Sequence, residues 1–167
     1  LSEALMGTLV YSANDMAQAL AIWDSGSESQ FVSKMNAQAK LWGLTNTEFK
    51  DATGLTSNGS MSSARDLSIL ASIALRSDFF RMATSQPRYS VTTLSGKRYL
   101  VTTTNKLLGS GGVIGTKTGY TLEAGECLLS LTSRQGHEII GVILGSSDRF
   151  GQTKTLLNTA YTNYQWK

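Results

Sequence analysis

The chain has 167 residues, a length typical of one compact domain, and its 41% hydrophobic and 16% charged residues exclude a disordered or low-complexity protein. One cysteine, Cys127, and one histidine, His137, exclude a disulfide framework and a cysteine-rich or multi-histidine metal site. The formal net charge of +3 comes from charges spread along the chain, and we therefore expect no nucleic-acid partner.

No apolar run in the chain approaches the roughly 18 residues that a membrane span requires, so we expect no membrane span. We recognise no secretory signal in the sequence. Leu1, Leu5 and Leu9 follow helical spacing from the first residue. We interpret this pattern as a start inside a folded unit.

The first half of the chain, residues 1–86, has mainly helical periodicity. Residues 1–10 predict a helix that breaks at 11–14, and the next helix has an apolar face of Met16, Ala19, Leu20 and Trp23. Ser27 and Ser63 lie where helix N-caps are expected, and a short helix is expected around 78–84. The helix after Ser27 is expected to have an apolar face of Phe31, Met35 and Trp42. The helix after Ser63 is expected to have an apolar face of Leu67, Leu70, Ala71, Ala74 and Leu75. The segment 44–62, rich in Thr, Asn, Gly and Ser, is mostly loop.

The second half, residues 87–167, changes to a period of two. Alternating residues around a turn at Ser95–Gly96 predict a hairpin over 89–101, and further strands are expected at 113–121, 126–133 and 138–145. The run 139–144 is apolar throughout, which predicts a strand covered on both faces. A final helix over 149–165 is expected to place on one face Phe150, Leu157, Tyr161 and Tyr164.

This order of elements indicates an α+β fold, in which a helical part packs on an antiparallel sheet that a C-terminal helix covers. The segregation of helices and strands disfavours a parallel βαβ array. Trp23, Trp42 and Cys127 are interpreted as core residues rather than as ligand contacts.

Two short groups of residues could carry chemistry. In Ser12-Ala13-Asn14, at the break between two helices, a hydroxyl able to relay a proton and an amide able to hold a carbonyl are two residues apart. Asn14 could also simply cap the second helix. In Lys117-Thr118-Gly119, within a predicted strand, Lys117 supplies positive charge, and Gly119 lets a substrate backbone lie close to the strand edge. An ordinary edge strand with a solubilising lysine is the alternative interpretation.

Short motifs follow one another over nearly the whole chain: YSANDMA at 11–17, NTEF at 46–49, GL at 54–55, SARDL at 63–67, TNKLL at 104–108, GTKTGYT at 115–121 and EAGECL at 123–128. The Lys-Thr-Gly triplet occurs in penicillin-recognising serine enzymes together with a Ser-x-x-Lys motif. In this order the motifs resemble those of the serine-type D-alanyl-D-alanine carboxypeptidases, the low-molecular-weight penicillin-binding proteins of the S11 peptidase type.

The resemblance implies roles for individual residues. Ser12 would relay a proton, Asn14 would hold the substrate, and Lys117 would act with Thr118 and Gly119 as the third motif of the family. The backbone N–H of Tyr120 would be one oxyanion-hole donor. Arg149 would hold the terminal carboxylate of the substrate through its guanidinium group. Thr104 and Tyr120 occupy positions where some relatives carry arginine and histidine.

The sequence departs from the family at one motif, because no serine is followed by lysine three positions later. In the family that Ser-x-x-Lys motif precedes the Ser-x-Asn motif, so we expect this chain to be the C-terminal two-thirds of a catalytic domain, inactive by itself because it lacks the nucleophile. We also expect it to be unstable or oligomeric without the missing segment.

The resemblance implies a peptidoglycan stem peptide ending in D-Ala-D-Ala as the substrate, β-lactams as acylating ligands, no cofactor, and a location in the periplasm or cell envelope of a bacterium. Two alternatives stay open. One is a non-catalytic module that binds peptidoglycan or penicillin, and the other is a hydrolase of the class A β-lactamase type.

Overall fold

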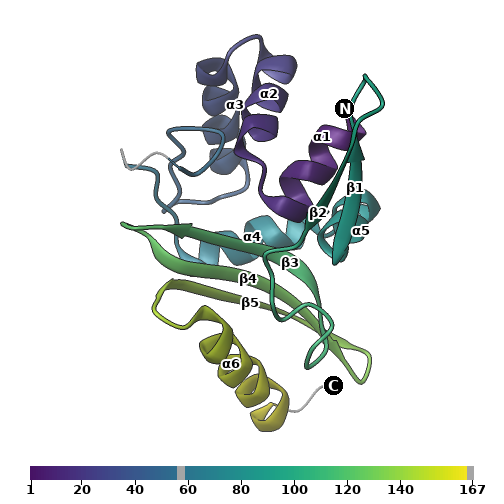
Figure 1. Cartoon of the computed structure of the whole chain (residues 1–167). Helices are drawn as coiled ribbons and strands as arrows, with labels where there is room; N and C mark the ends of the chain where they lie inside the picture. The colour runs from purple at the N-terminus through teal and green to yellow at the C-terminus, as the bar shows by residue number, and fades with distance from the viewer. Residues whose placement is uncertain (56–58, 165–167) are drawn as a thin grey trace.

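Six α-helices, one π-helix and five strands make up the residues described by this computed structural model, which are 1–55 and 59–164. In chain order the elements are α1 Ser2–Met6, the π-helix η1 Gly7–Tyr11, α2 Asn14–Ser25, α3 Glu28–Leu41, α4 Ala64–Ala74, α5 Asp78–Thr84, β1 Arg88–Thr92, β2 Arg98–Thr102, β3 Val113–Thr121, β4 Gly125–Arg134, β5 His137–Ser146 and α6 Arg149–Asn163. Figure 1 shows α6 on one side of the sheet formed by β3, β4 and β5, and the other helices on the opposite side.

The strands form two antiparallel sheets rather than one. The hairpin of β1 and β2 pairs only with itself, whereas β3, β4 and β5 form a sheet in that order. The predicted α+β class and the predicted strands are therefore confirmed, while the hairpin stands apart from the other three strands. β3 lies at one edge of the larger sheet, with its outer backbone groups directed toward the helical part.

Helices cover both faces of the larger sheet, as the apolar run 139–144 predicts. Along β4, Leu128 packs against Leu157 of α6, while Leu131 packs against Ala71 of α4 and against Leu75, the C-cap residue of that helix. This alternation follows from the period of two in a strand. Both α4 and α6 also contact β5. Because α4 belongs to residues 1–86, the two predicted parts of the chain share a core, and their boundary at residues 86–87 stays a prediction.

The hairpin is fixed to the N-terminal helices through a smaller core. Met6 and Val10 pack with Ala83 of α5, and Tyr89 and Val101 of the hairpin pack against them. The Glu3 carboxylate accepts hydrogen bonds from the Tyr89 hydroxyl at 3.0 Å and from the Thr92 backbone N–H at 2.7 Å. These contacts fix the hairpin to the N-terminal helical residues beside the larger sheet.

Four predictions from the helical pattern are wrong in detail. The helix predicted over 1–10 changes to a π-helix at Gly7, and the last helix ends at Asn163, which leaves Tyr164 67% exposed. Trp23 and Trp42, expected in the core, are 69% and 37% exposed. The fully buried residues of α2 and α3 are small, Ala21 and Ala39, so these helices pack closely and leave their large side chains outside.

The predicted N-caps are confirmed. The Ser27 hydroxyl accepts from the Gln30 N–H at 3.3 Å, and the Ser63 hydroxyl accepts from the Asp66 N–H at 3.1 Å. Within residues 1–55 and 59–164, none of the helices combines the length and the hydropathy that a membrane crossing requires. Trp166 lies outside the described residues.

Candidate active site

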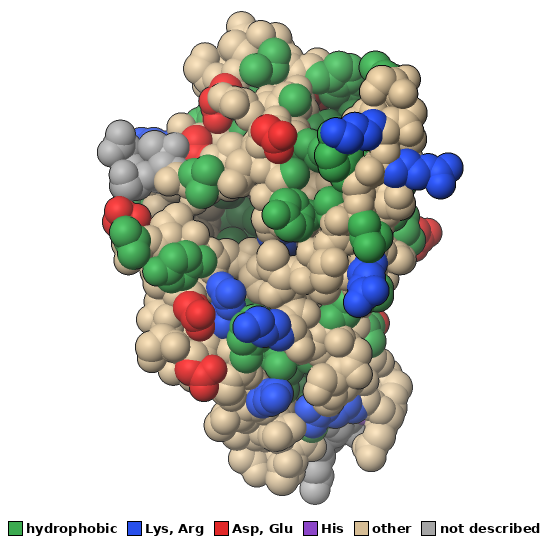
Figure 2. All heavy atoms as spheres, in the orientation of Figure 1, with side chains coloured by type: hydrophobic (Ala, Val, Ile, Leu, Met, Phe, Trp, Pro, Cys, Tyr) green, Lys and Arg blue, Asp and Glu red, His purple; other side chains and the backbone are tan. Residues whose placement is uncertain are grey.

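A polar cleft of about 430 Å³ lies between the helical part and the edge strand β3. Figure 2 shows the molecular surface hollowed between these two parts. The cleft is lined by the loop 52–55 and by the helical residues Thr8 and Ala17. It is also lined by all seven site residues predicted from the sequence: Ser12, Asn14, Lys117, Thr118, Gly119, Tyr120 and Arg149. The structure therefore brings the two motifs into one cavity, while the roles of the individual residues stay predictions.

The backbone around Ser12 has an uncommon conformation. The π-helix η1 ends at Tyr11, and Ser12 follows it with φ 68° and ψ 42°, in the left-handed region. A side chain in this region strains the backbone by about 1–3 kcal/mol, and such residues cluster at functional sites. The wide turn and the left-handed residue direct Ser12 toward β3 instead of continuing the helix.

Lys117 connects the two sides of the cleft. Its Nζ donates a hydrogen bond to Ser12 Oγ, 105 residues away in the sequence, and a second one to the backbone oxygen of Thr118 at 3.0 Å. Burial, and then the charge of Arg149, lowers the pKa of Lys117 from 10.5 to about 8. At neutral pH the group is still mainly protonated, so the cleft contains a poorly solvated positive charge next to a hydroxyl.

Asn14 does not cap the second helix. Ala13 is the N-cap residue of α2 and makes no side-chain cap, and Asn14 is the first residue of the helix. Among the hydrogen bonds found within residues 1–55 and 59–164, none engages the Asn14 amide group. Its carboxamide therefore lines the cleft with donor and acceptor groups available to a ligand, which removes the capping interpretation.

Arg149 lies at the start of α6, where two acidic residues fix its backbone. Asp148 is the N-cap of this helix and accepts from the Gly151 N–H, and the Glu126 carboxylate accepts from the Arg149 N–H at 3.1 Å. The Arg149 guanidinium donates to the Gly119 oxygen at 2.8 Å and stacks over the Phe150 ring. Its Nε is buried and has no partner within the part of the chain that the structure describes. Arg149 thus presents a positive group beside the edge strand.

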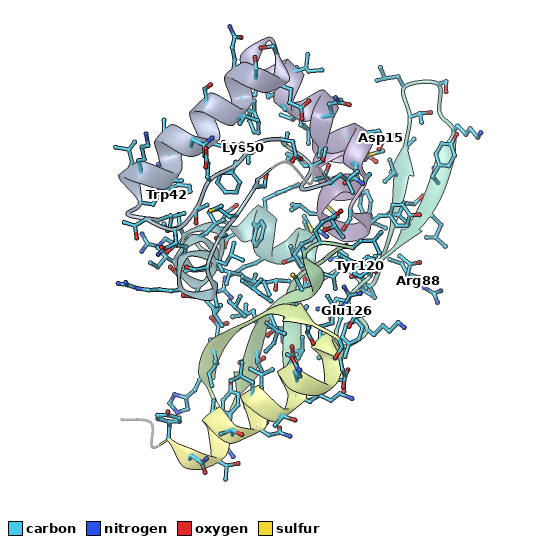
Figure 3. The ribbon with its side chains drawn as sticks, turned by 90° about the vertical axis from the view of Figure 1, so that its left-hand side faces the viewer. Asp15, Trp42, Lys50, Arg88, Tyr120 and Glu126 are labelled. Carbon is cyan, nitrogen blue, oxygen red and sulfur yellow. The ribbon has the colours of Figure 1, made fainter. Side chains whose placement is uncertain are left out.

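Tyr120 extends the exposed end of β3 beside these cations. Its side chain is 59% exposed, and its partner across the sheet is Glu126. Figure 3 shows Tyr120 at the boundary between the helical part and the sheet, with Glu126 close to it. A ligand in the cleft would therefore contact an aromatic ring as well as the positive charges.

The loop 52–55 forms a wall of the cleft that the sequence alone did not assign to the site. The buried carboxylate of Asp51 accepts from the N–H and the hydroxyl of Thr53, each at 2.7 Å, and from the Gly54 N–H. Glu28, at the start of α3, accepts from the Ala52 N–H at 3.1 Å. Gly54-Leu55 could have indicated that this loop belongs to the site, because the pair is one of the motifs that resemble the family.

A second cavity, about 440 Å³, adjoins the polar cleft and is lined mainly by apolar side chains of α4 and of the sheet. The two cavities share Lys117, Thr118 and Gly119. Cys127, predicted to be a core residue, is only half-buried and lines this apolar cavity opposite Gly119. The apolar surroundings explain why burial is the larger cause of the lowered pKa of Lys117.

The matches to known proteins agree with this geometry. Residues 1–148 match the family model of the S11 peptidases, described as D-alanyl-D-alanine carboxypeptidase. The chain therefore belongs to the D-alanyl-D-alanine carboxypeptidase family of S11 peptidases.

Individual relatives cover nearly all of this chain. It is 37% identical, over 99% of its length, to the D-alanyl-D-alanine carboxypeptidase DacF of Bacillus subtilis. Among solved structures, a serine-to-alanine mutant of a Streptomyces DD-transpeptidase superposes over 96% of this chain with a TM-score of 0.89 and 30% identity. A penicillin-binding protein homologue from Mycobacterium tuberculosis superposes over 99% with a TM-score of 0.90 and 27% identity.

The chain spans only part of these proteins. It covers 43% of the length of the Bacillus relative and 67% of the Streptomyces chain. The activity of a whole protein that contains this chain is therefore a proposal.

Proposed function

We propose that this chain forms the substrate-binding half of a serine D-alanyl-D-alanine carboxypeptidase that β-lactams acylate. The observation that carries the proposal is the hydrogen bond from Lys117 Nζ to Ser12 Oγ, because it joins the two family motifs across one cleft. The family match and the fold of the solved relatives support the same reaction class.

The proposed substrate is a peptidoglycan stem peptide ending in D-Ala-D-Ala. An extended peptide tail would lie along the free edge of β3, where strand backbone groups are available for pairing. Its terminal carboxylate would lie near the positive groups of Lys117 and Arg149, and the Asn14 amide would hold a peptide carbonyl or N–H. A β-lactam carboxylate would occupy the same positive region.

The nucleophile in this proposal is the serine of a Ser-x-x-Lys motif elsewhere in the whole protein. Its oxygen adds to the carbonyl carbon of the penultimate D-Ala, and the bond to the nitrogen of the terminal D-Ala then breaks. The Lys117 ammonium occupies a lone pair of Ser12, so the Ser12 proton is free to pass to the departing amine nitrogen. The proton that the nucleophilic serine loses replaces the proton that Ser12 gave to the amine. Water then hydrolyses the acyl-serine in a later step.

Peptidoglycan lies outside the cytoplasm, so the proposal includes a periplasmic or envelope location. A non-catalytic binding module is the second candidate function, because no serine of this chain has lysine three positions later. The class A β-lactamase alternative receives less support, since the family model that matches residues 1–148 is that of the carboxypeptidases.

Incubation of the full-length protein that contains this chain with a fluorescent penicillin tests the proposal. We expect a covalent adduct together with release of D-alanine from an acyl-D-Ala-D-Ala peptide. The Lys117→Ala variant should lose both activities, while Lys34→Ala, which removes an exposed surface ion pair, serves as the control that keeps them. A folded protein that binds the peptide without an adduct or D-alanine release would establish the non-catalytic alternative.

A further inference from the structure

The third-motif residue Thr118 has a partner that the sequence did not indicate. Its side-chain hydroxyl is hydrogen-bonded to the hydroxyl of Thr104, which comes from the loop between β2 and β3. Both threonines line the polar cleft. Within residues 1–55 and 59–164, neither hydroxyl has another hydrogen-bond partner, so the pair is isolated from the rest of the protein network.

The backbone of Thr104 is held in place by its two neighbours. The Thr103 N–H donates to the Pro87 oxygen at 3.0 Å. Asn105 is buried, its N–H donates to Thr103 Oγ1 at 3.2 Å, and its Oδ1 accepts from the Leu107 N–H at 3.0 Å. Since Leu107 belongs to the core under α6, the hydroxyl of Thr104 is supported by rigid structure although it faces solvent.

A hydroxyl has one proton, so the direction of this hydrogen bond decides what Thr118 can offer a ligand. If Thr118 donates to Thr104, only its lone pairs face the cleft, and these repel an anion. If Thr104 donates to Thr118, the Thr118 proton is free to point into the cleft. The cations Lys117 and Arg149 line the same cavity, and they favour a negatively charged ligand group there.

We propose that Thr104 is a positioning residue that donates to Thr118 and so directs the Thr118 proton toward a ligand carboxylate. This inference rests on the proposed function, because it assumes a carboxylate ligand in the cleft. It predicts that Thr104 affects carboxylate-bearing ligands selectively and does not affect the acylation chemistry itself.

The test compares Thr104→Val, which keeps the shape and removes the hydroxyl, with Thr104→Ser, which keeps the hydroxyl. In the full-length protein, the second-order acylation rate is measured with a penicillin and with its methyl ester, which lacks the carboxylate charge. We expect Thr104→Val to slow acylation by the acid about tenfold and acylation by the ester less than about twofold, because the Thr118 hydroxyl loses the donor that directs its proton toward the carboxylate. Thr104→Ser should behave as the wild type.

Equal slowing of acid and ester in Thr104→Val, or no slowing of either, would overturn the role of Thr104. If the wild-type protein forms no adduct, the proposed function fails, and the inference is then decided by binding. Affinities for an acyl-D-Ala-D-Ala peptide and for its C-terminal amide are measured by calorimetry, and Thr104→Val should remove most of the preference for the acid. An unchanged preference would contradict the inference. Thr104→Ala, with thermal unfolding monitored, repeats the comparison if the valine variant is unstable.

Discussion

A lysine and a serine that are far apart in the sequence define the chemistry of this cleft. Lys117 is poorly solvated, close to Arg149 and bonded to Ser12, and its pKa is lowered to about 8. A charge on this group is therefore easier to remove than on an ordinary lysine. Because a substrate carboxylate would be attracted by that charge, the ionisation of Lys117 should control ligand capture.

The pH dependence of acylation follows from this ionisation. Lys117 is charged below pH 8 and neutral above it, so the second-order rate of penicillin acylation should decrease as the pH rises through about 8. A pH–rate profile of the full-length protein measures this. Lys117→Arg, which keeps its charge throughout, should be slower but should show no decrease in this range. A wild-type rate that increases through pH 8 would indicate that the neutral amine is the active form.

The residues of the site could be named from the sequence only because of the family motifs. Spacing alone gives no reason for Ser12 and Lys117 to meet, since the contact joins segments 105 residues apart. The Thr104–Thr118 pair was not predicted, because a side-chain hydrogen bond between a loop and a strand depends on the tertiary fold. Asp51 was also missed, since a loop carboxylate has no periodic pattern to identify it.

At the scale of the elements, the loop 52–55 is held by a carboxylate rather than by regular structure. Asp51 accepts hydrogen bonds from Thr53 and Gly54, and the loop forms one wall of the cleft. Its conformation therefore depends on a few polar contacts that substitution can remove singly.

Substitution of Asp51 should loosen this wall. Asp51→Ala should lower the free energy of unfolding by about 1–3 kcal/mol, because buried donors lose their acceptor, and it should also weaken ligand binding. Asp51→Asn keeps one carbonyl oxygen and should have a smaller effect on both. Urea unfolding and penicillin acylation of the full-length protein measure the two quantities. Equal effects of the two variants would show that the loop does not depend on these acceptors.

The close approach of α6 to the sheet depends on the absence of a side chain at Gly141. A Cβ atom at this position would lie 2.8 Å from Ser130 Oγ and 3.4 Å from Leu157 Cδ2. Gly141→Ala should therefore lower the free energy of unfolding by about 1–3 kcal/mol. The loss should be smaller in a Ser130→Ala background, where the nearest atom is absent. Additive effects in this double-mutant cycle, measured by urea unfolding, would rule out the clash.

Periodicity predicted the strands and their bounds well, because alternation along β4 and β5 corresponds to real faces covered by α4 and α6. It failed for α2 and α3, where the apolar patterns include Trp23 and Trp42 on exposed faces. An amphipathic pattern shows which face of a helix is apolar. Whether another element packs against that face depends on the tertiary fold. The π-helix could not be predicted, since the pattern of residues 7–11 does not distinguish its wider hydrogen bonding from that of an α-helix.

At the scale of the whole molecule, the described residues leave much apolar surface uncovered. Large apolar side chains are exposed on the helices, on the hairpin and beside β3, among them Trp23, Leu41, Leu94, Leu100 and Leu122. The apolar cavity next to Lys117 adds further apolar surface. Monomeric soluble proteins rarely expose contiguous apolar patches of large area.

The 167-residue chain produced alone should therefore associate with itself or unfold readily. Sedimentation should show species larger than the monomer, and a hydrophobic dye should bind strongly. The full-length protein is the control and should bind little dye. A monomeric chain that unfolds in one cooperative transition would contradict this prediction.

The wide turn at Gly7–Tyr11 gives the site a dependence on residue count as well as on residue type. A π-helix behaves as an α-helix with one inserted residue, and each residue turns a helix by about 100°. A one-residue deletion in this turn would remove the inserted residue and restore an ordinary helical turn, which would leave Ser12 directed toward Lys117. A two-residue deletion would leave the turn one residue short and would rotate Ser12 away by about 100°, although both side chains would be unchanged. A protein that differed by this two-residue deletion would therefore keep the residues Ser12, Asn14 and Lys117 and still lose the pairing across the cleft.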